Sequence, residues 1–253
     1  MMQEKKFNRW FNAFILIGMT VATVFATASE LKTGDSGKFL ILLAAFSSIM
    51  GILGVLCSAN ASIFTFLFGF FEVSTYSVLC FINWRATGVG LGNALIFSLY
   101  FLPMQFVGFY QWRHHGAEAD KPVQARRQTP AQRWLFTGLL LVGTAVAYYM
   151  LSLADKSAAG QFLRVALVMD AASMVCNILG QMLLSTAYME QWIFWIGVNV
   201  FSVIMWSITL SKGGDGTSYA LILVIKYAFY LLNSLNGLRI WLGLSKKAQC
   251  LEY

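Results

Sequence analysis

Charged side chains are scarce in this sequence of 253 residues, because only 11 % of them are Asp, Glu, Lys or Arg. Soluble domains contain about 25 % of such residues. The hydrophobic fraction is 58 % and the mean hydropathy is +0.65. So few charges cannot cover the surface of a soluble fold of this length. The composition therefore excludes a soluble protein and predicts a chain that lies in a lipid bilayer.

Cysteine and proline are also rare, with four and three residues. The cysteines are isolated, so they form neither a CxxC metal pattern nor a recognisable disulfide framework. No GxxxxGK[ST] phosphate-binding loop occurs, so nothing in the sequence indicates that ATP is used. We therefore expect no metal and no other cofactor. A chain this short has no room for a separate catalytic domain beside its membrane spans, so we expect no enzymatic activity.

Long apolar runs fill the sequence instead, separated by short polar or turn-rich breaks. A helix needs about 20 apolar residues to cross the hydrocarbon of a bilayer. The run lengths predict an all-α integral membrane protein with eight spans: 10–29, 39–58, 61–82, 90–112, 134–153, 163–184, 189–210 and 218–242. The first span follows basic residues and resembles a secretory signal, but its apolar run is longer than a signal core. We interpret it as a retained helix.

The net charge of +7 is modest and is distributed unevenly about these spans. Eleven Lys and Arg residues fall on the side of the two termini and six on the other, with Lys226 inside a span. Under the positive-inside rule, this bias predicts cytoplasmic termini and a cytoplasmic loop at 113–133. The charge is thus a topology signal, and we expect membrane lipids but no nucleic acid as partners.

Three short matches, in order, suggest an internal repeat. Ile52-Leu53-Gly54 recurs as Ile178-Leu179-Gly180, at an offset of 126 residues. Phe68 and Glu72 parallel Trp195 and Asn199 at an offset of 127, which puts Thr65 at the place of Trp192. Gly108-x-x-x-Trp112 recurs as Gly237-x-x-x-Trp241, at an offset of 129.

The loop lengths of the two halves also agree, so we expect two parallel three-helix bundles joined by an inverting helix. The chain then divides into an N-terminal segment with an extra helix and outer loop, a first bundle, a basic loop, a linker helix with an outer loop, a second bundle and a cytoplasmic tail. Their ranges are 1–37, 38–112, 113–133, 134–162, 163–242 and 243–253.

Polar side chains form stripes along several spans, and such residues usually face a cavity or a partner because lipid does not solvate them. The candidates for a substrate site are Trp192, Trp195, Asn199, Gln105, Glu72, Asp170, Asn177, Asn233 and Lys226. Glu72, Asp170 and Lys226 fit a structural ion pair as well as substrate contacts. Asn177 also fits a hydrogen bond between helices.

The glycines and terminal tryptophans of the repeat have simpler explanations. Gly108 and Gly237 fit close packing between helices. Trp112 and Trp241 fit an aromatic belt at the membrane interface.

The sequences W-x-x-W-x-x-x-N at Trp192, Trp195 and Asn199 and Q-x-x-G-x-x-x-W at Gln105, Gly108 and Trp112 resemble the PnuC family of bacterial nicotinamide riboside transporters. The resemblance covers about 38–242. It implies a SWEET-like fold of three, one and three helices and a homotrimer in the bacterial inner membrane. It also implies facilitated diffusion by alternating access through a site between the bundles, made net by phosphorylation in the cytoplasm.

The residues themselves leave two alternatives open. A sugar or other vitamin porter of the same fold would use the same polar stripes, although only Pro103 lies within a span, whereas sugar porters of this fold have pocket prolines in several helices. A retinal photoreceptor would use Lys226 for the Schiff base, with Asp170 or Glu72 as its counter-ion.

Overall fold

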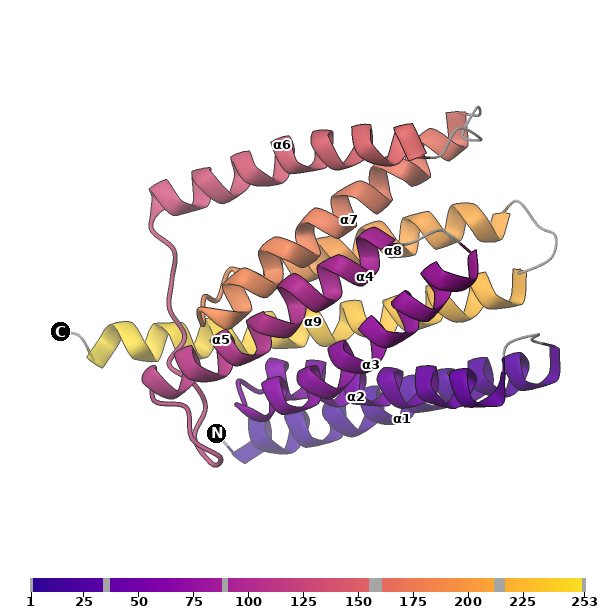
Figure 1. Ribbon diagram of the computed structural model, residues 1–253. Coiled ribbons are helices and arrows are strands. Elements are labelled where there is room, and N and C mark those ends of the chain that lie inside the picture. Colours follow the sequence, from indigo (N-terminus) through magenta and orange to yellow (C-terminus); the bar gives the residue numbers. More distant parts are fainter. Residues whose placement is uncertain (1, 34–36, 88–90, 155–160, 212–216, 252–253) are drawn as a thin grey trace. The chain divides into compact units, whose positions relative to one another are not determined.

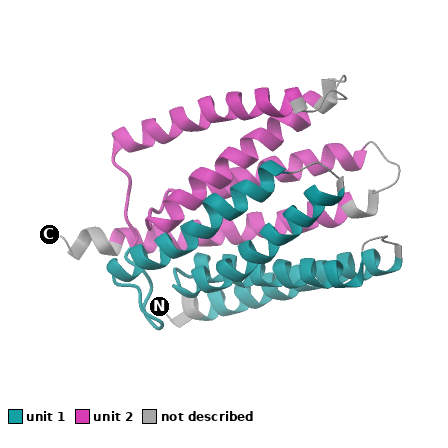
Figure 2. Cartoon of the chain, in the orientation of Figure 1, with its two compact units in different colours: residues 1–124 teal, residues 125–253 magenta. Residues whose placement is uncertain are grey.

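The computed structural model describes residues 2–33, 37–87, 91–154, 161–211 and 217–251. Within these residues, eight helical segments are long and apolar enough to cross a membrane, which confirms the expected number of spans. The chain separates into two compact units, residues 1–124 and 125–253 (Figure 2). Each unit contains four of the eight segments.

The first unit begins with α1 (Met2–Thr33), which packs against α2 (Lys38–Ala59), and α2 packs in turn against α3 (Phe64–Thr87) (Figure 1). The last span of this unit is built from α4 (Leu91–Ile96), a π-helical turn η1 (Phe97–Phe101) and α5 (Leu102–His114). The π turn ends two residues before Pro103, which has no N–H to donate to the preceding turn. The expected span at 90–112 is therefore a helix with a local defect.

The second unit contains α6 (Pro130–Ala154), α7 (Gln161–Ser185), α8 (Gln191–Ser211) and α9 (Thr217–Leu251). Each of these helices packs against the next along the chain. The expected linker helix is α6, and it packs against α7 just as α1 packs against α2. α9 continues past the expected span end at 242, so the segment from 243 to 251 is helical.

α6 has a local start signal. The Thr129 hydroxyl accepts a hydrogen bond from the Gln132 N–H at 3.3 Å, and the Gln132 side-chain oxygen accepts one from the Thr129 N–H at 2.9 Å. This reciprocal pair is a capping box, and it satisfies two backbone donors at the helix start. Pro130 at the first helical position costs nothing there, because that N–H has no partner in a helix.

The loops α2–α3 and α7–α8 have the same conformation. Ala61 and Ala187 both adopt positive φ, at 56° and 59°, which is uncommon for a residue other than glycine. The N–H of Ser62 donates to Cys57 O and that of Tyr188 to Leu183 O, each at 2.9 Å. Every residue of one loop corresponds to a residue 126 positions later in the other. The two helix pairs are therefore a structural repeat with a fixed register.

This register corrects the sequence alignment within α3 and α8. A Cβ atom on Gly54 would lie 3.8 Å from the Phe68 Cβ, and one on Gly180 would lie 3.4 Å from the Phe194 Cβ. Phe68 thus corresponds to Phe194, not to Trp195 as the offset of 127 suggested. The offset stays at 126 through the loop because the loop hydrogen bonds leave no room for an extra residue.

Candidate functional site

The aromatic residues near the loop ends pack in the same way in both units. In the first unit, a Cβ on Gly108 would overlap the Phe66 ring, and that ring meets Trp112 edge-on at 4.9 Å between centroids. In the second unit, a Cβ on Gly237 would overlap the Trp192 ring, which meets Trp241 edge-on at 6.3 Å. The counterpart of Trp192 is therefore Phe66, not Thr65.

These contacts decide between the explanations offered by the sequence. Gly108 and Gly237 are close-packing positions, as their simpler explanation proposed. Trp112 and Trp241 are both 0 % exposed, so the aromatic belt was the wrong explanation for them. A belt tryptophan presents its ring to the lipid headgroups, whereas Trp112 is buried against Phe66 and Trp241 is buried against Trp192.

Trp195 and Asn199 lie further along α8 and are arranged differently. Trp195 is half-buried, and its indole lies over Gly180 of α7, whose Cβ position is 3.3 Å from the ring. Asn199 is 6 % exposed and donates from Nδ2 to the Trp195 carbonyl at 2.8 Å and to Ser234 Oγ at 3.0 Å. The second unit thus places a partly accessible aromatic face one helical turn from a buried amide.

The remaining candidates of the second unit lie on α7 and α9. Asn177 is half-buried and donates to the Ser173 carbonyl at 3.1 Å, while Asp170 is exposed, one turn before Ser173. On α9, Asn233 is buried, and Lys226 lies 5.7 Å from the centre of the Tyr230 ring. Of these, Asn233 is adjacent in sequence to Ser234, the partner of Asn199.

In the first unit, Gln105 of α5 is buried and donates from Nε2 to the Phe101 carbonyl at 3.1 Å. Its carboxamide fills the space beside Gly69 of α3. Glu72 lies half-buried on α3, with its side chain against Gly51 of α2, and its backbone carbonyl accepts a bond from Ser47 Oγ at 3.1 Å. Both residues therefore lie inside the helix bundle of their unit.

Gln191 escaped the sequence analysis. It occupies the position that corresponds to Thr65, whose hydroxyl donates to the Gly54 carbonyl at 3.0 Å. Gln191 is completely buried, and neither atom of its amide has a hydrogen-bond partner in the described part of the chain; the same holds for Trp192 Nε1. Buried polar atoms usually have a partner, so this end of α8 has hydrogen-bonding capacity that no group in the described ranges satisfies.

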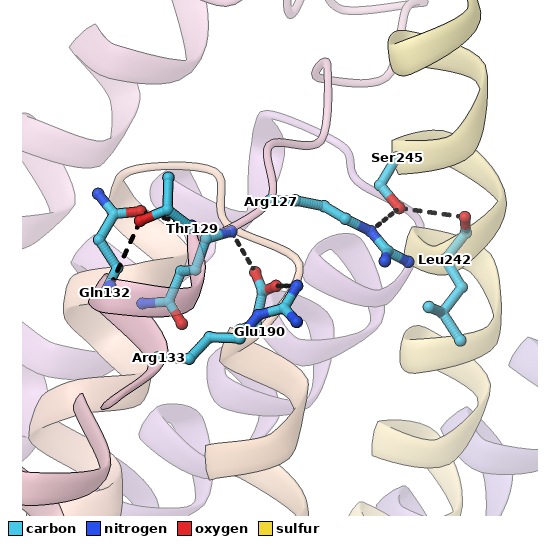
Figure 3. A network of polar contacts seen from close by, with 8 residues as sticks. Arg127, Thr129, Gln132, Arg133, Glu190, Leu242 and Ser245 are labelled. Carbon is cyan, nitrogen blue, oxygen red and sulfur yellow. Dashed lines mark hydrogen bonds and ion pairs between the residues drawn. The ribbon is translucent and has the colours of Figure 1, made fainter. Parts of the chain in front are cut away.

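The basic segment before α6 makes contacts that the sequence analysis did not identify. Glu190 is 3 % exposed and accepts hydrogen bonds from Arg133 Nη2 and from the Gln128 N–H, both at 3.1 Å (Figure 3). Arg127 Nε donates to Ser245 Oγ at 3.2 Å, which ties the segment to α9. We call residues 126–133 with Glu190 and Ser245 the connector clamp. A sequence signal was present only in the capping box at Thr129.

The connector clamp also binds the α7–α8 loop. The Arg126 N–H donates to Ala187 O at 2.8 Å, the Met189 N–H donates back to Arg126 O at 2.9 Å, and the guanidinium lies 4.6 Å from the centre of the Tyr188 ring. In the first unit, the Val123 N–H donates to Ala61 O at 3.1 Å. The connecting chain therefore uses the carbonyls of the two equivalent alanines with positive φ.

Eight spans, a structural repeat of helical hairpins and polar side chains buried among apolar helices define a multi-pass membrane protein of the transporter class. The chain belongs to the nicotinamide mononucleotide transporter family, which it matches over residues 41–243.

Two relatives are described as nicotinamide riboside transporter PnuC. The protein of Neisseria mucosa is 32 % identical over 209 residues, which are 81 % of this chain and 73 % of that protein. The protein of Haemophilus influenzae is 28 % identical over 96 % of both chains. A crystal structure described as the vitamin B3 transporter PnuC matches with a TM-score of 0.65 and 28 % identity, over 94 % of this chain and 92 % of that one.

Proposed function

We propose that this protein carries nicotinamide riboside across the bacterial inner membrane by facilitated diffusion with alternating access. Phosphorylation of the riboside in the cytoplasm would trap it there, so that more riboside enters the cell than leaves it. The two relatives described as riboside transporters support this substrate. Membership of a transporter family favours a porter over the photoreceptor interpretation of Lys226.

The observation that carries the proposal is the neighbourhood of Trp195 and Asn199. Nicotinamide riboside has a permanently cationic pyridinium ring, a carboxamide and ribose hydroxyls. A partly accessible indole attracts a flat cation through its π face, and the amide of Asn199 one turn away both donates and accepts hydrogen bonds. The unused polar atoms of Gln191 and Trp192 add donors and an acceptor at the same end of α8.

The other predicted contacts keep their roles within this proposal. Gln105, Asn177 and Asn233 supply amides for the carboxamide or the ribose, and Glu72 or Asp170 balances the positive ring. Lys226 is a further predicted substrate contact. In keeping with the resemblance, we infer a homotrimer surrounded by membrane lipids. The positive-inside bias places its termini in the cytoplasm.

A mononucleotide is the second candidate substrate, because the matching family carries that name. Its phosphate would need a cation or several N–H donors. Lys226 is the one cation among the proposed contacts, and Gly180 and Ser234, which lie beside Trp195 and Asn199, carry no charge, so a doubly charged phosphate would lack most of the positive charge it needs. This chemistry favours the riboside over the mononucleotide.

One experiment tests the proposal. Isothermal titration of the purified protein with nicotinamide riboside, nicotinamide mononucleotide and ribose should give binding for the riboside, at least tenfold weaker binding for the mononucleotide and none for the sugar. Tighter binding of the mononucleotide would favour the second candidate. If none of the three ligands binds, the proposed function is wrong.

A further inference from the structure

α3 and α5 approach each other closely at two successive helical turns. At the first contact, the Phe66 ring covers Gly108. At the second, the carboxamide of Gln105 lies over Gly69. The residues are three apart on each helix, so they lie on one face of α3 and one face of α5. The two contacts form a ladder between the helices.

α8 and α9 carry the equivalent positions. Trp192 covers Gly237 at the first contact, as Phe66 covers Gly108. The offsets of 126 for the first helix and 129 for the second then make Trp195 the counterpart of Gly69 and Ser234 the counterpart of Gln105. At this position the larger residue is Gln105 of α5 in the first unit and Trp195 of α8 in the second, where the indole lies over Gly180 of α7. The larger and the smaller residue of this pair therefore lie on opposite helices in the two units.

The exchange depends on the missing side chain of Gly69. A Cβ built there would overlap Oε1 of Gln105 and lie 3.1 Å from its Cδ, so the carboxamide would have to move. Gln105 is 6 % exposed, and its amide donates to the Phe101 carbonyl at the end of η1. Glycine inside a helix is less favourable than alanine, because its backbone loses more conformational freedom on folding. At position 69 the absence of a side chain leaves room for the buried amide of Gln105.

We propose that Gly69 is a positioning residue of the transport site: it holds the carboxamide of Gln105 in the orientation that contacts the substrate. The inference rests on the proposed function, because it takes nicotinamide riboside as the ligand and Gln105 as one of its contacts. It assigns to the first unit an amide at the place where the second unit has Trp195.

A double-mutant cycle tests this role. Riboside affinity and melting temperature are measured for the wild type, Gly69→Ala, Gln105→Ala and the double variant. Gly69→Ala should weaken binding about three- to tenfold, the effect of one displaced neutral hydrogen bond. In the Gln105→Ala background, the same change should alter affinity less than twofold. Gln105→Asn, which is shorter by one methylene, should restore part of the affinity to Gly69→Ala.

Gly54→Ala is the matched control, because the nearest atom to its Cβ position lies at 3.7 Å, an ordinary contact distance. It should leave the affinity unchanged and should not lower the melting temperature. An equal loss of affinity from Gly69→Ala in both backgrounds would overturn the proposal, and so would normal binding by that variant when Gln105→Ala is weakened.

Two further results separate the causes of failure. If Gly69→Ala does not fold, the double variant with Gln105→Ala should fold, because the overlapping atoms are gone; its failure would also overturn the proposal. If Gln105→Ala binds normally while Trp195→Ala is weakened, the positioning role is wrong and the proposed function stands. If the wild type itself binds no riboside, the proposed function is what fails.

Discussion

The two tryptophans of the W-x-x-W sequence lie in different surroundings. Trp192 is 2 % exposed and rests on Gly237, whereas Trp195 is half-buried beside Gly180. The Trp192 indole N–H has no partner within the described residues. Trp195 has the more accessible ring. We therefore expect a substitution at Trp195 to affect substrate binding more than the stability of the protein.

Replacement of Trp195 tests the aromatic contact directly. Trp195→Phe keeps an aromatic face and should weaken riboside binding mildly, while Trp195→Ala should cost about 1 to 3 kcal/mol of binding free energy, since both stacking and the cation–π attraction are lost. Titration calorimetry measures both variants. Wild-type affinity in Trp195→Ala would remove this ring from the site.

Asn199 has both a structural bond and a proposed ligand contact, and a matched pair of variants separates them. Ser234→Ala removes the bond between α8 and α9 at a cost of about 1 kcal/mol of stability, but it keeps the Asn199 amide. Asn199→Leu removes the amide as well. We expect a lower melting temperature in both variants and weaker riboside binding only in Asn199→Leu. Equal affinities in the two variants would make Asn199 purely structural.

Helix packing in each unit depends on an aromatic ring that fits against a glycine. Gly237→Ala should destabilise the protein by about 1 to 3 kcal/mol, because the Trp192 ring must move out of a fully packed position. Gly243→Ala on the same helix is the control. No atom lies within 4 Å of its Cβ position, so the change should raise stability slightly through helix propensity. Thermal unfolding in detergent compares the two, and similar melting temperatures would contradict the packing argument.

The second prediction at this scale concerns the ion pair of the connector clamp. Arg133→Gln leaves the Glu190 carboxylate, which is 3 % exposed, without its cation. We expect a loss of about 1 to 3 kcal/mol of stability, less than for a fully buried pair because Arg133 itself is half exposed. Lys121→Gln breaks an ion pair of similar length, 3.0 Å, between exposed side chains, and it should leave the melting temperature unchanged because water screens the pair.

Melting temperatures of the two purified variants provide the comparison. An unchanged value for Arg133→Gln would mean that the backbone bonds hold the connector without the ion pair.

For the whole molecule, the central prediction is the orientation in the membrane. Single cysteines are placed at Glu118 and at Gly37, which are both exposed, in a protein with Cys250→Ser to remove labelling of the tail. A membrane-impermeant maleimide added to intact cells should label the cysteine at 37 but not the one at 118, because the positive-inside bias puts residue 118 in the cytoplasm. Labelling at 118 from outside would reverse the topology.

Much of the architecture follows from the sequence. Apolar runs of sufficient length predicted the eight spans, since a bilayer imposes a minimum helix length and requires the backbone to satisfy its own hydrogen bonds. The repeat was visible at Ile52-Leu53-Gly54 and in Gly108-x-x-x-Trp112, because identical packing needs selected the same residues twice. Both signals are local, so they do not depend on knowing which helices meet.

The tertiary structure decided what depends on contacts between distant residues. The register of 126 is set by loops whose alanines, Ala61 and Ala187, adopt positive φ. An alanine in a sequence does not predict this conformation, which is typical of glycine. The sequence also could not show that Trp112 is enclosed rather than facing lipid, or that Glu190 binds a connector some 60 residues earlier. The sequence specifies the type of each side chain, but the packing of the helices determines which neighbours bury it or pair with it.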